Sequence, residues 1–273
     1  MANSRKLRGS VEFREASVKQ FNADLRRSAR DLERSMAAIA ARLKLADGFF
    51  VTDARNLARL AVARREIAQR LKDSGYQDAV GRLLGTRSKI ARAVQQEYRA
   101  FSGKRAAFAK PDLDAFAAIS GAHFDAFADL GDEAVNVMRR GLQRAVSTGE
   151  SFESWSKQLA LTLDNGATVA AARTLARTAT TQLHRVMQRR LDDELGITRW
   201  TYVGPDDDVT RPFCSALIAE AEAGETWTEE EIDELDNSRE NGGAGAGPGS
   251  AREQGGGWNC RHLWEPVLEP ERP

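Results

Sequence analysis

Apolar residues recur at helical spacing over most of the chain, from about residue 10 to residue 195. In the first segment they return every seven residues while arginines fill the opposite face, a pattern that predicts a long amphipathic helix. Its apolar stripe consists of Val18, Phe21, Leu25, Leu32, Met36, Ile39 and Leu43. A stripe with this repeat is suited to packing against a partner helix.

The same spacing predicts five more helices before residue 196. Gly75, Gly103 and Pro111 mark the joints between the first of them. The second helix of the chain carries Leu57, Leu60, Ile67 and Leu71, and the third carries Val80, Leu83, Leu84, Ile90, Val94 and Phe101. A fourth helix covers residues 111–146, and a short one covers "SFESWSKQLALTL".

The last of these helices has the clearest ends. Thr168 is placed to cap its N-terminus and Gly196 to follow its last residue. His184 lies at the edge of its apolar stripe, and His123 lies beside the apolar run of an earlier helix with no second metal-ligand residue near it. Both histidines are therefore predicted to be packing or surface residues.

The periodicity changes after residue 196. Trp200 and Tyr202 alternate with other residues in "ITRWTYV", which predicts a strand, and "WNCRHLWEPVL" predicts a second. Between them, "TRPFCSALIAEAEAG" and "TEEEIDEL" predict helices, the latter beginning with a capping box of Thr228 and Glu231.

Two strands alone predict a small antiparallel pair packed on the preceding helices. In that pairing Val203 lies beside Asn259, which brings an acidic turn, Cys214 and the triplet "CRH" together. The cysteine and the histidine of the triplet share one face of the strand, and its arginine points away from that face.

These patterns predict a mainly α protein with a small α+β module near its C-terminus. We expect a basic helical arm or bundle at residues 1–110, a helical segment at 111–164 and the C-terminal module at 165–273. Within the module, the glycine-rich stretch at residues 241–257 predicts a flexible loop.

Charge is distributed unevenly although the chain as a whole is neutral. Residues 1–110 hold 25 Lys/Arg against 11 Asp/Glu, whereas residues 206–273 hold 5 against 17. The basic part is suited to an anionic neighbour, either nucleic acid or an acidic protein surface. The alternative is a solvated helix face, because arginine and lysine are good helix formers.

The sequence has neither a membrane-spanning run of about 20 apolar residues nor an N-terminal secretory signal, so we expect folding in a cytoplasm. Two cysteines provide no disulfide framework, and a reducing compartment disfavours the one pair they could form.

Residues 165–268 carry several motifs in a characteristic order. They are a helix with Ala176, Arg177 and Thr178, a strand with Trp200, a turn with Asp207, Thr210 and Arg211 followed by Cys214, and a closing Cys260, Arg261 and His262. This order resembles the phage head morphogenesis family, also called phage Mu F-like or minor capsid proteins. The helices before residue 165 resemble that family only in being helical.

The resemblance implies a structural virion protein that is assembled in the host cytoplasm. It implies a position in the capsid interior or at the portal vertex, with portal or capsid proteins as partners and several copies in each virion. It also implies a role in head assembly and in DNA packaging or ejection. We expect no membrane partner, and the absence of a recognisable catalytic motif predicts no enzymatic activity.

Three motif residues offer ligands for a metal. Cys214, Cys260 and His262 are ligands that zinc prefers, and Asp207 or Asp208 could complete the four that a structural zinc site requires. The alternatives are a buried reduced cysteine pair and a disulfide formed in the released virion.

The acidic turn also has a structural explanation. Asp207 and Thr210 can cap backbone amides of the turn, and Arg211 can pair with a carboxylate or donate to strand-end carbonyls.

Two other functions stay open. In an enzyme of the nuclease or transferase type, His262 would act as a base and Arg211 would stabilise charge, but no further catalytic motif accompanies them. In a DNA-binding or scaffold-like factor, the basic residues 1–110 would carry the activity.

Overall fold

The computed structural model describes residues 8–104 and 107–267 of the 273. They form two compact units, each assembled from separate stretches of the chain. The first unit combines the described residues of Met1–Val18, Gly85–Gly121 and Thr174–Pro273, and the second combines Lys19–Leu84 and Ala122–Arg173.

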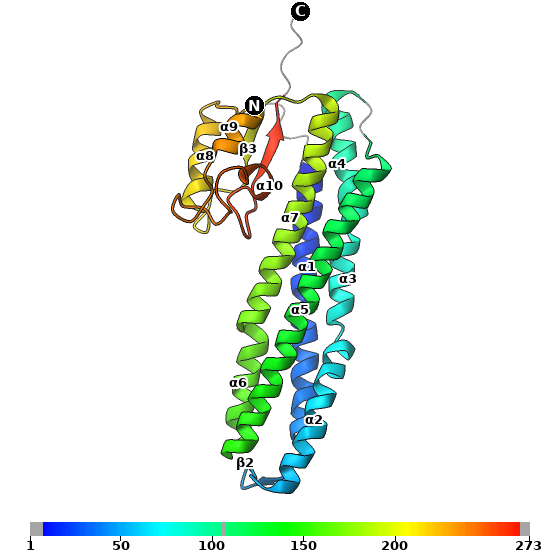
Figure 1. Cartoon of the computed structure of the whole chain (residues 1–273), viewed down its shortest axis with the longest axis vertical. Coiled ribbons are helices and arrows are strands. Elements are labelled where there is room, and N and C mark those ends of the chain that lie inside the picture. The colour runs from blue at the N-terminus through cyan, green and yellow to red at the C-terminus, as the bar shows by residue number, and fades with distance from the viewer. Residues whose placement is uncertain (1–7, 105–106, 268–273) are drawn as a thin grey trace, which may run out of the picture. The chain divides into compact units, whose positions relative to one another are not determined.

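Helices make up most of the described residues, which confirms the mainly α fold predicted from the sequence. They are α1 (Arg8–Ala40), α2 (Ala54–Asp73), α3 (Tyr76–Gly85), α4 (Arg87–Ser102), α5 (Lys110–Thr148), α6 (Phe152–Asn165), α7 (Ala167–Leu195), α8 (Pro212–Glu222), α9 (Glu229–Glu234) and α10 (Ala251–Gln254) (Figure 1). Among the described residues, no helix is both long enough and apolar enough to cross a membrane.

The core of the second unit is built from α1, α2, α5 and α6. Met36, Ile67 and Leu142 are fully buried in it, and Trp155 is nearly so. The apolar stripe predicted on α1 is confirmed, because all seven of its residues are buried. Removal of this apolar surface from water is the main favourable contribution to folding of such helices.

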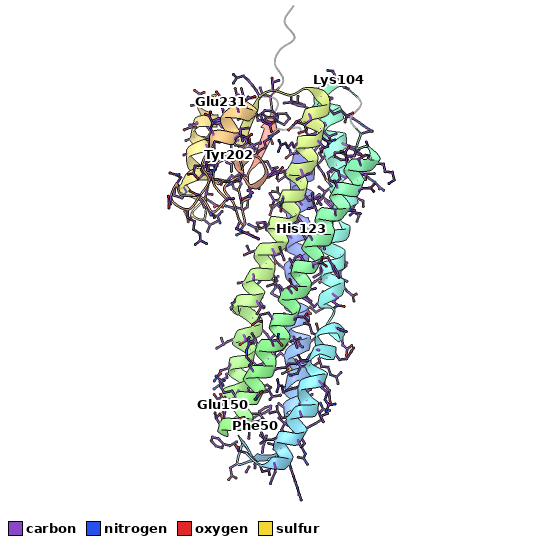
Figure 2. All side chains as sticks on the ribbon, viewed as in Figure 1. Phe50, Lys104, His123, Glu150, Tyr202 and Glu231 are labelled. Carbon is purple, nitrogen blue, oxygen red and sulfur yellow. The ribbon has the colours of Figure 1, made fainter. Side chains whose placement is uncertain are left out.

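A short β-hairpin, which the sequence pattern did not predict, connects α1 to α2. Its strands are β1 (Leu45–Ala46) and β2 (Phe49–Phe50), which pair antiparallel. Asp47 and Gly48 between them both have positive φ, 51° and 83°, as in the type I′ turn that favours Asp-Gly. The amide of Phe50 donates to the carbonyl of Glu150 at 3.0 Å, and Figure 2 shows both residues at the same end of this unit.

Asn56, rather than Leu57, turns inward at the start of α2. Its side chain accepts the amide N–H of Lys44 at 2.8 Å and donates to the carbonyls of Lys44 and Val51 at 3.1 and 2.8 Å. Leu57 is 44% exposed, so the stripe predicted for α2 is wrong at that residue. Asn56 therefore provides hydrogen-bond partners for three backbone groups beside the hairpin, one amide and two carbonyls.

Two helix boundaries differ from the prediction. The predicted third helix is divided into α3 and α4 at Gly85 and Thr86. The N-cap predicted at Thr168 is wrong, because Gly166 has the extended backbone of a cap and its carbonyl accepts two amides of the first turn of α7. Gly196, with φ of 66°, follows the last residue of α7 as predicted.

The C-terminal strands pair antiparallel as predicted, but their register differs. They are β3 (Trp200–Val203) and β4 (Leu263–Pro266). Val203 lies opposite Leu263, so the predicted pairing with Asn259 is wrong. Positive φ angles at Gly257 and Asn259, 93° and 62°, turn the chain before the strand begins. The "CRH" triplet therefore precedes β4.

The capping box predicted at the start of α9 is confirmed. Thr228 Oγ1 accepts the amide N–H of Glu231, and the Glu231 carboxylate accepts the amide N–H of Thr228. This cap orients the helix so that Ile232 is buried in a core rich in aromatic residues, where the Trp227 and Trp264 rings meet edge to face with centroids 5.5 Å apart.

We expect Leu142→Ala to lower the free energy of unfolding of the second unit by about 2 to 5 kcal/mol, because it leaves a cavity in a fully buried layer. Leu161→Ala is the matched control, since Leu161 is 68% exposed, and it should change stability by less than about 0.5 kcal/mol. Urea denaturation followed by circular dichroism measures both. Equal effects of the two substitutions would contradict the described core.

Candidate functional site

Polar side chains stabilise the turn that leads into α8. The amide of Asp207 donates to Thr210 Oγ1 at 3.0 Å, and its carboxylate accepts the amide N–H of Val209 at 3.2 Å. Pro212 then begins the helix, at the position where a missing N–H is no loss. Cys214 follows in the first turn, and only 1% of its surface is exposed.

Two arginines connect this turn with the segment that precedes β4. Arg261 donates to both carboxylate oxygens of Asp207, at 2.8 and 2.5 Å, and Arg211 donates to the carbonyl of Trp258 at 2.6 Å. The hydrogen bonds from Arg261 hold the pKa of Asp207 well below its usual range. These two contacts hold together stretches about 50 residues apart in the sequence.

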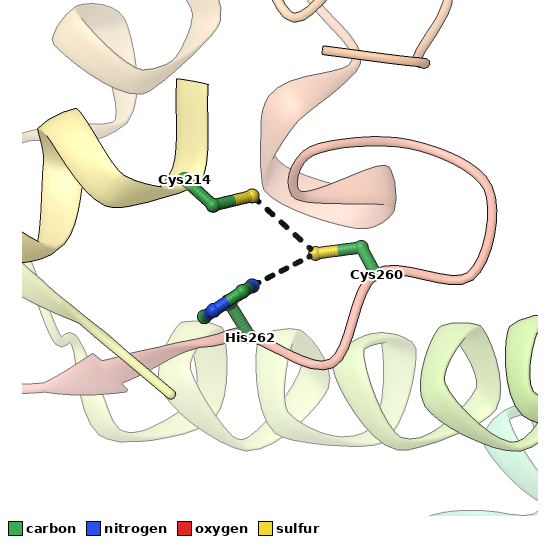
Figure 3. Close-up of side chains that lie close together, drawn as sticks. All are labelled: Cys214, Cys260 and His262. Atoms are coloured by element: carbon green, nitrogen blue, oxygen red, sulfur yellow. Dashed lines mark hydrogen bonds between the residues drawn. The ribbon is translucent and has the colours of Figure 1, made fainter. Parts of the chain in front are cut away.

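The structure brings Cys214, Cys260 and His262 into one buried cluster (Figure 3). The Sγ atoms of the two cysteines are 4.0 Å apart, and Cys260 Sγ lies 3.4 Å from His262 Nδ1. All three potential ligand atoms lie within 4.8 Å of one another. Both cysteines are free thiols. Two thiols and an imidazole at this spacing form a set that could hold a soft or borderline metal ion.

Among the described residues, no carboxylate joins this cluster. The carboxylate of Asp207 is bonded to Arg261, and Asp208 is exposed. The fourth ligand predicted at one of these two aspartates is therefore not brought to the cysteines.

The hydrogen bonds of His262 define which of its nitrogens faces the sulfurs. Nε2 lies 2.7 Å from the carbonyl oxygen of Pro205, and because a carbonyl only accepts, Nε2 carries a proton. In the neutral ring the lone pair is then on Nδ1, which faces Cys260. Gly204 allows this close approach, since a Cβ there would lie 2.1 Å from the His262 ring.

The two cysteines differ in their electrostatic surroundings. The hydrogen bond between them lowers the pKa of Cys260 well below its usual value, with further lowering by the guanidinium of Arg185, and it raises the pKa of Cys214. Cys260 Sγ also accepts the amide N–H of Gly256 at 3.2 Å. Cys260 is therefore the more acidic of the two thiols.

Tyr202 of β3 is a fourth member of the cluster. Its Oη lies 3.5 Å from Cys214 Sγ and 3.6 Å from Cys260 Sγ, and its ring stacks on that of His262 at 5.4 Å between centroids. The alternation of strand β3 indicated a buried face, but nothing in the sequence indicated that the hydroxyl would lie beside the sulfurs.

Two buried arginines hold the backbone of the "CRH" triplet. Arg185 of α7 donates to the carbonyl of His262 through Nε and Nη2, at 3.2 and 2.6 Å, and to the carbonyl of Glu253 through Nη1 at 3.1 Å. Arg14 of α1 donates to the carbonyl of Arg261 at 3.2 Å. Burial lowers the pKa of Arg14 to about 10. The helical pattern alone did not indicate that these arginines are buried.

Three glycines close the chain over the sulfurs. A Cβ on Gly256 would lie 2.3 Å from Cys214 Sγ, and one on Gly255 would lie 2.9 Å from Cys260 Sγ. A Cβ on Gly257 would meet the backbone of Ala244 at 2.0 Å. The end of the predicted flexible loop is thus a buried backbone segment whose glycines are required by close packing.

Asn237 organises the rest of this glycine-rich segment. Its amide donates to the carbonyl of Gly255 at 2.6 Å, and its Oδ1 accepts from the amide of Gly247 and the hydroxyl of Ser250 at 2.9 and 2.8 Å. The asparagine is fully buried, and α10 follows directly after these contacts. The predicted loop is therefore a segment with specific hydrogen bonds.

Asp192 of α7 is a second buried polar centre in this unit. Its carboxylate accepts hydrogen bonds from Tyr98 at 2.6 Å, Trp200 at 2.8 Å and Arg252 at 2.5 Å. The Arg252 guanidinium also lies over the Trp200 ring, 4.0 Å from its centroid. Burial raises the pKa of Asp192 to about 6, although its three donors oppose the shift.

A serine, a histidine and a glutamate also contact one another in this unit, but the serine lies between the other two, whereas in a hydrolase the histidine does. Ser10 Oγ lies 2.5 Å from Glu97 and 3.1 Å from Nε2 of His184. Because the serine donates to the carboxylate, it accepts from the imidazole, which therefore cannot remove its proton. His184 is fully buried, in agreement with a packing role, and His123 is half-buried on α5.

No protein-family model matches this chain, and neither a curated protein nor a solved structure was found to match it.

We expect the stability of the wild type relative to Asp192→Asn to fall by roughly 3 kcal/mol as the pH rises from about 4 to about 7. The folded-state pKa of Asp192, about 6, is raised above its unfolded value, so the folded protein holds a proton in this window that the unfolded chain has released. Stability present at low pH is thus lost as the pH rises. Urea denaturation across this range measures the difference.

Asp193→Asn is the matched control, because Asp193 is the next residue of α7 and is exposed. This variant should not show the fall expected for the wild type relative to Asp192→Asn, because Asp193 is at the surface. A wild-type advantage over Asp192→Asn that grows with pH would show that the ion pair with Arg252 outweighs burial.

Proposed function

We propose that this protein is a structural minor capsid protein that acts in phage head morphogenesis near the portal. The proposal rests on the resemblance of residues 165–268 to the phage Mu F-like family. One structural observation supports it: the separate motifs that carry the resemblance contact one another within a single unit.

Each motif has a partner in another motif or in the backbone beside one. Thr178 Oγ1, in the Ala-Arg-Thr run of α7, accepts the amide N–H of Asn259 at 3.1 Å, directly before the "CRH" triplet. Asp207 of the turn binds Arg261, and Cys214 contacts Cys260. Residues that hold a module together in this way are expected to occur in the same order in every protein that contains the module. A fixed order of motifs is the basis of the resemblance.

The motif residues are engaged in holding the backbone, which favours a structural role over catalysis. Arg211, the residue predicted to stabilise charge in an enzyme, donates a hydrogen bond to the carbonyl of Trp258. His262 donates its Nε2–H to the carbonyl of Pro205. A base and an anion-binding group would need free hydrogen-bonding positions directed at a substrate.

Under this proposal the partners are portal or capsid proteins, and several copies are present in each virion, in the capsid interior or at the portal vertex. Assembly takes place in the host cytoplasm, and the protein contributes to DNA packaging or ejection.

A tagged copy should co-purify with mature virions and be absent from procapsids that lack the portal.

Arg261→Ala should reduce the incorporation of the tagged protein into virions severalfold, because Asp207 then loses both of its hydrogen bonds from the guanidinium. Arg239→Ala is the control, since Arg239 is exposed, and should be incorporated normally. Immunoblots of gradient-purified particles measure all three. Equal recovery of the tagged protein from portal-less procapsids would argue against a portal-associated role.

DNA binding through the basic helices is a second candidate function, favoured by the surface of α2. Six basic residues of this helix are exposed, against two acidic residues in the same helix. The six basic residues are Arg55, Arg59, Arg64, Arg65, Arg70 and Lys72. Neutralisation of phosphates by such side chains releases counterions and makes binding sensitive to salt.

The whole chain should then bind duplex DNA at low salt, with an affinity that falls steeply as salt is added. Arg55→Glu combined with Arg59→Glu should weaken binding and lower the slope of log affinity against log salt by about two. Arg239→Glu tests the effect of a charge change in the acidic part of the chain. Fluorescence anisotropy provides the measurement, and an absence of binding at low salt would remove this function.

A further inference from the structure

Four potential metal ligands converge between β3, α8 and the segment before β4. Two are the sulfurs of Cys214 and Cys260, one is Nδ1 of His262 and one is the hydroxyl oxygen of Tyr202. All four side chains are buried, with at most 3% of each exposed.

Two of the distances between these atoms are close to those of a tetrahedral zinc site. Zinc–sulfur bonds of about 2.3 Å and zinc–nitrogen bonds of about 2.0 to 2.1 Å place two sulfurs about 3.8 Å apart and a sulfur and a nitrogen about 3.5 Å apart. The corresponding separations here are 4.0 Å between Cys214 and Cys260 and 3.4 Å between Cys260 and His262. The third separation, between Cys214 Sγ and the His262 nitrogen, is at most 4.8 Å, against about 3.5 Å in a tetrahedral site, so these two side chains would approach each other to accept an ion.

Tyr202 occupies the place of the fourth ligand. A zinc–oxygen bond of about 2.1 Å puts an oxygen about 3.6 Å from each sulfur. The Tyr202 hydroxyl lies 3.5 and 3.6 Å from the two sulfurs. No aspartate, glutamate or further histidine of the described residues competes for this position.

The surroundings orient the ligands as metal sites require. His262 donates its Nε2–H to the carbonyl of Pro205, the contact that commonly fixes a metal-binding histidine and directs its other nitrogen at the ion. The Nδ1 lone pair faces Cys260 Sγ at 3.4 Å, so both atoms can bind one ion once the thiol proton is released. The amide of Gly256, which donates to Cys260 Sγ, is a frequent neighbour of a metal-bound thiolate.

We propose that Cys214, Cys260 and His262 bind one zinc ion, with the hydroxyl oxygen of Tyr202 as the fourth ligand. The site is structural: it joins the first turn of α8 to the segment before β4 and does not depend on the proposed function. Binding releases the thiol protons of the cysteines to solvent and leaves the ion bonded to two thiolates, a neutral imidazole and the tyrosine oxygen.

The whole chain, purified in zinc and passed through a desalting column, should retain about one zinc ion per molecule by mass spectrometry of the metal. Cys214→Ser, Cys260→Ser and His262→Ala should each lose most of it. His123→Ala is the matched control, because His123 belongs to the second unit, and it should retain the ion. A wild-type protein that retains almost no zinc under these conditions overturns the proposal.

Cobalt(II) makes the test independent of whether the variants fold. Cobalt-loaded wild type should show sulfur-to-cobalt charge transfer in the near ultraviolet and the intense visible bands of a tetrahedral ion. An octahedral spectrum, or one without charge transfer, contradicts the site. Tyr202→Phe should keep the charge transfer and shift the visible bands. An unchanged visible spectrum removes Tyr202 from the ligand set.

Discussion

The candidate site depends on one buried guanidinium, that of Arg185. It binds the carbonyls of Glu253 and His262, which lie on either side of the glycine turn that carries Cys260. A charged donor to neutral carbonyls is a strong hydrogen bond, and it is stronger where water is excluded. Because Arg185 belongs to α7, this one side chain holds both ends of the turn against the part of that helix that lies in the first unit.

Close packing explains why glycine is abundant where the sulfurs meet. At Gly255 and Gly256 even a methyl group would overlap sulfur atoms, and both residues are buried. The same composition that suggests a flexible linker therefore serves a compact arrangement, in which the backbone itself covers the cysteines. Glycine has no side chain to bond the backbone, so Asn237 does this: its side chain binds the carbonyl of Gly255 and the amide of Gly247.

Much of the fold was predictable from the sequence because it follows from local periodicity. The stripe on α1, the capping box at Thr228 and the antiparallel strand pair are of this kind. The approach of Cys214 to the "CRH" triplet was also predictable, because an antiparallel pair brings those segments together even when its register is displaced.

The remaining features depend on contacts between residues distant in the sequence. Arg185 and Asp192 lie on α7 among polar residues, and only the elements packed around them make them buried. Tyr202 is a further example, because its hydroxyl contacts the sulfurs of two cysteines that lie 12 and 58 residues away in the sequence. Periodicity identifies which face of an element is apolar, but it does not identify the partner of an individual polar group.

The composition of the two units has a consequence for biosynthesis. The second unit uses residues 19–84 and 122–173, whereas the first needs residues 8–18 and the described residues of 85–121 together with residues 174–267. During translation, the second unit can therefore complete its core while the segment that carries both cysteines has yet to leave the ribosome. The first unit must wait until the early residues of α1 meet the last segments made. A ribosome that has translated only as far as residue 173 would thus hold a chain that lacks β3, β4 and both cysteines.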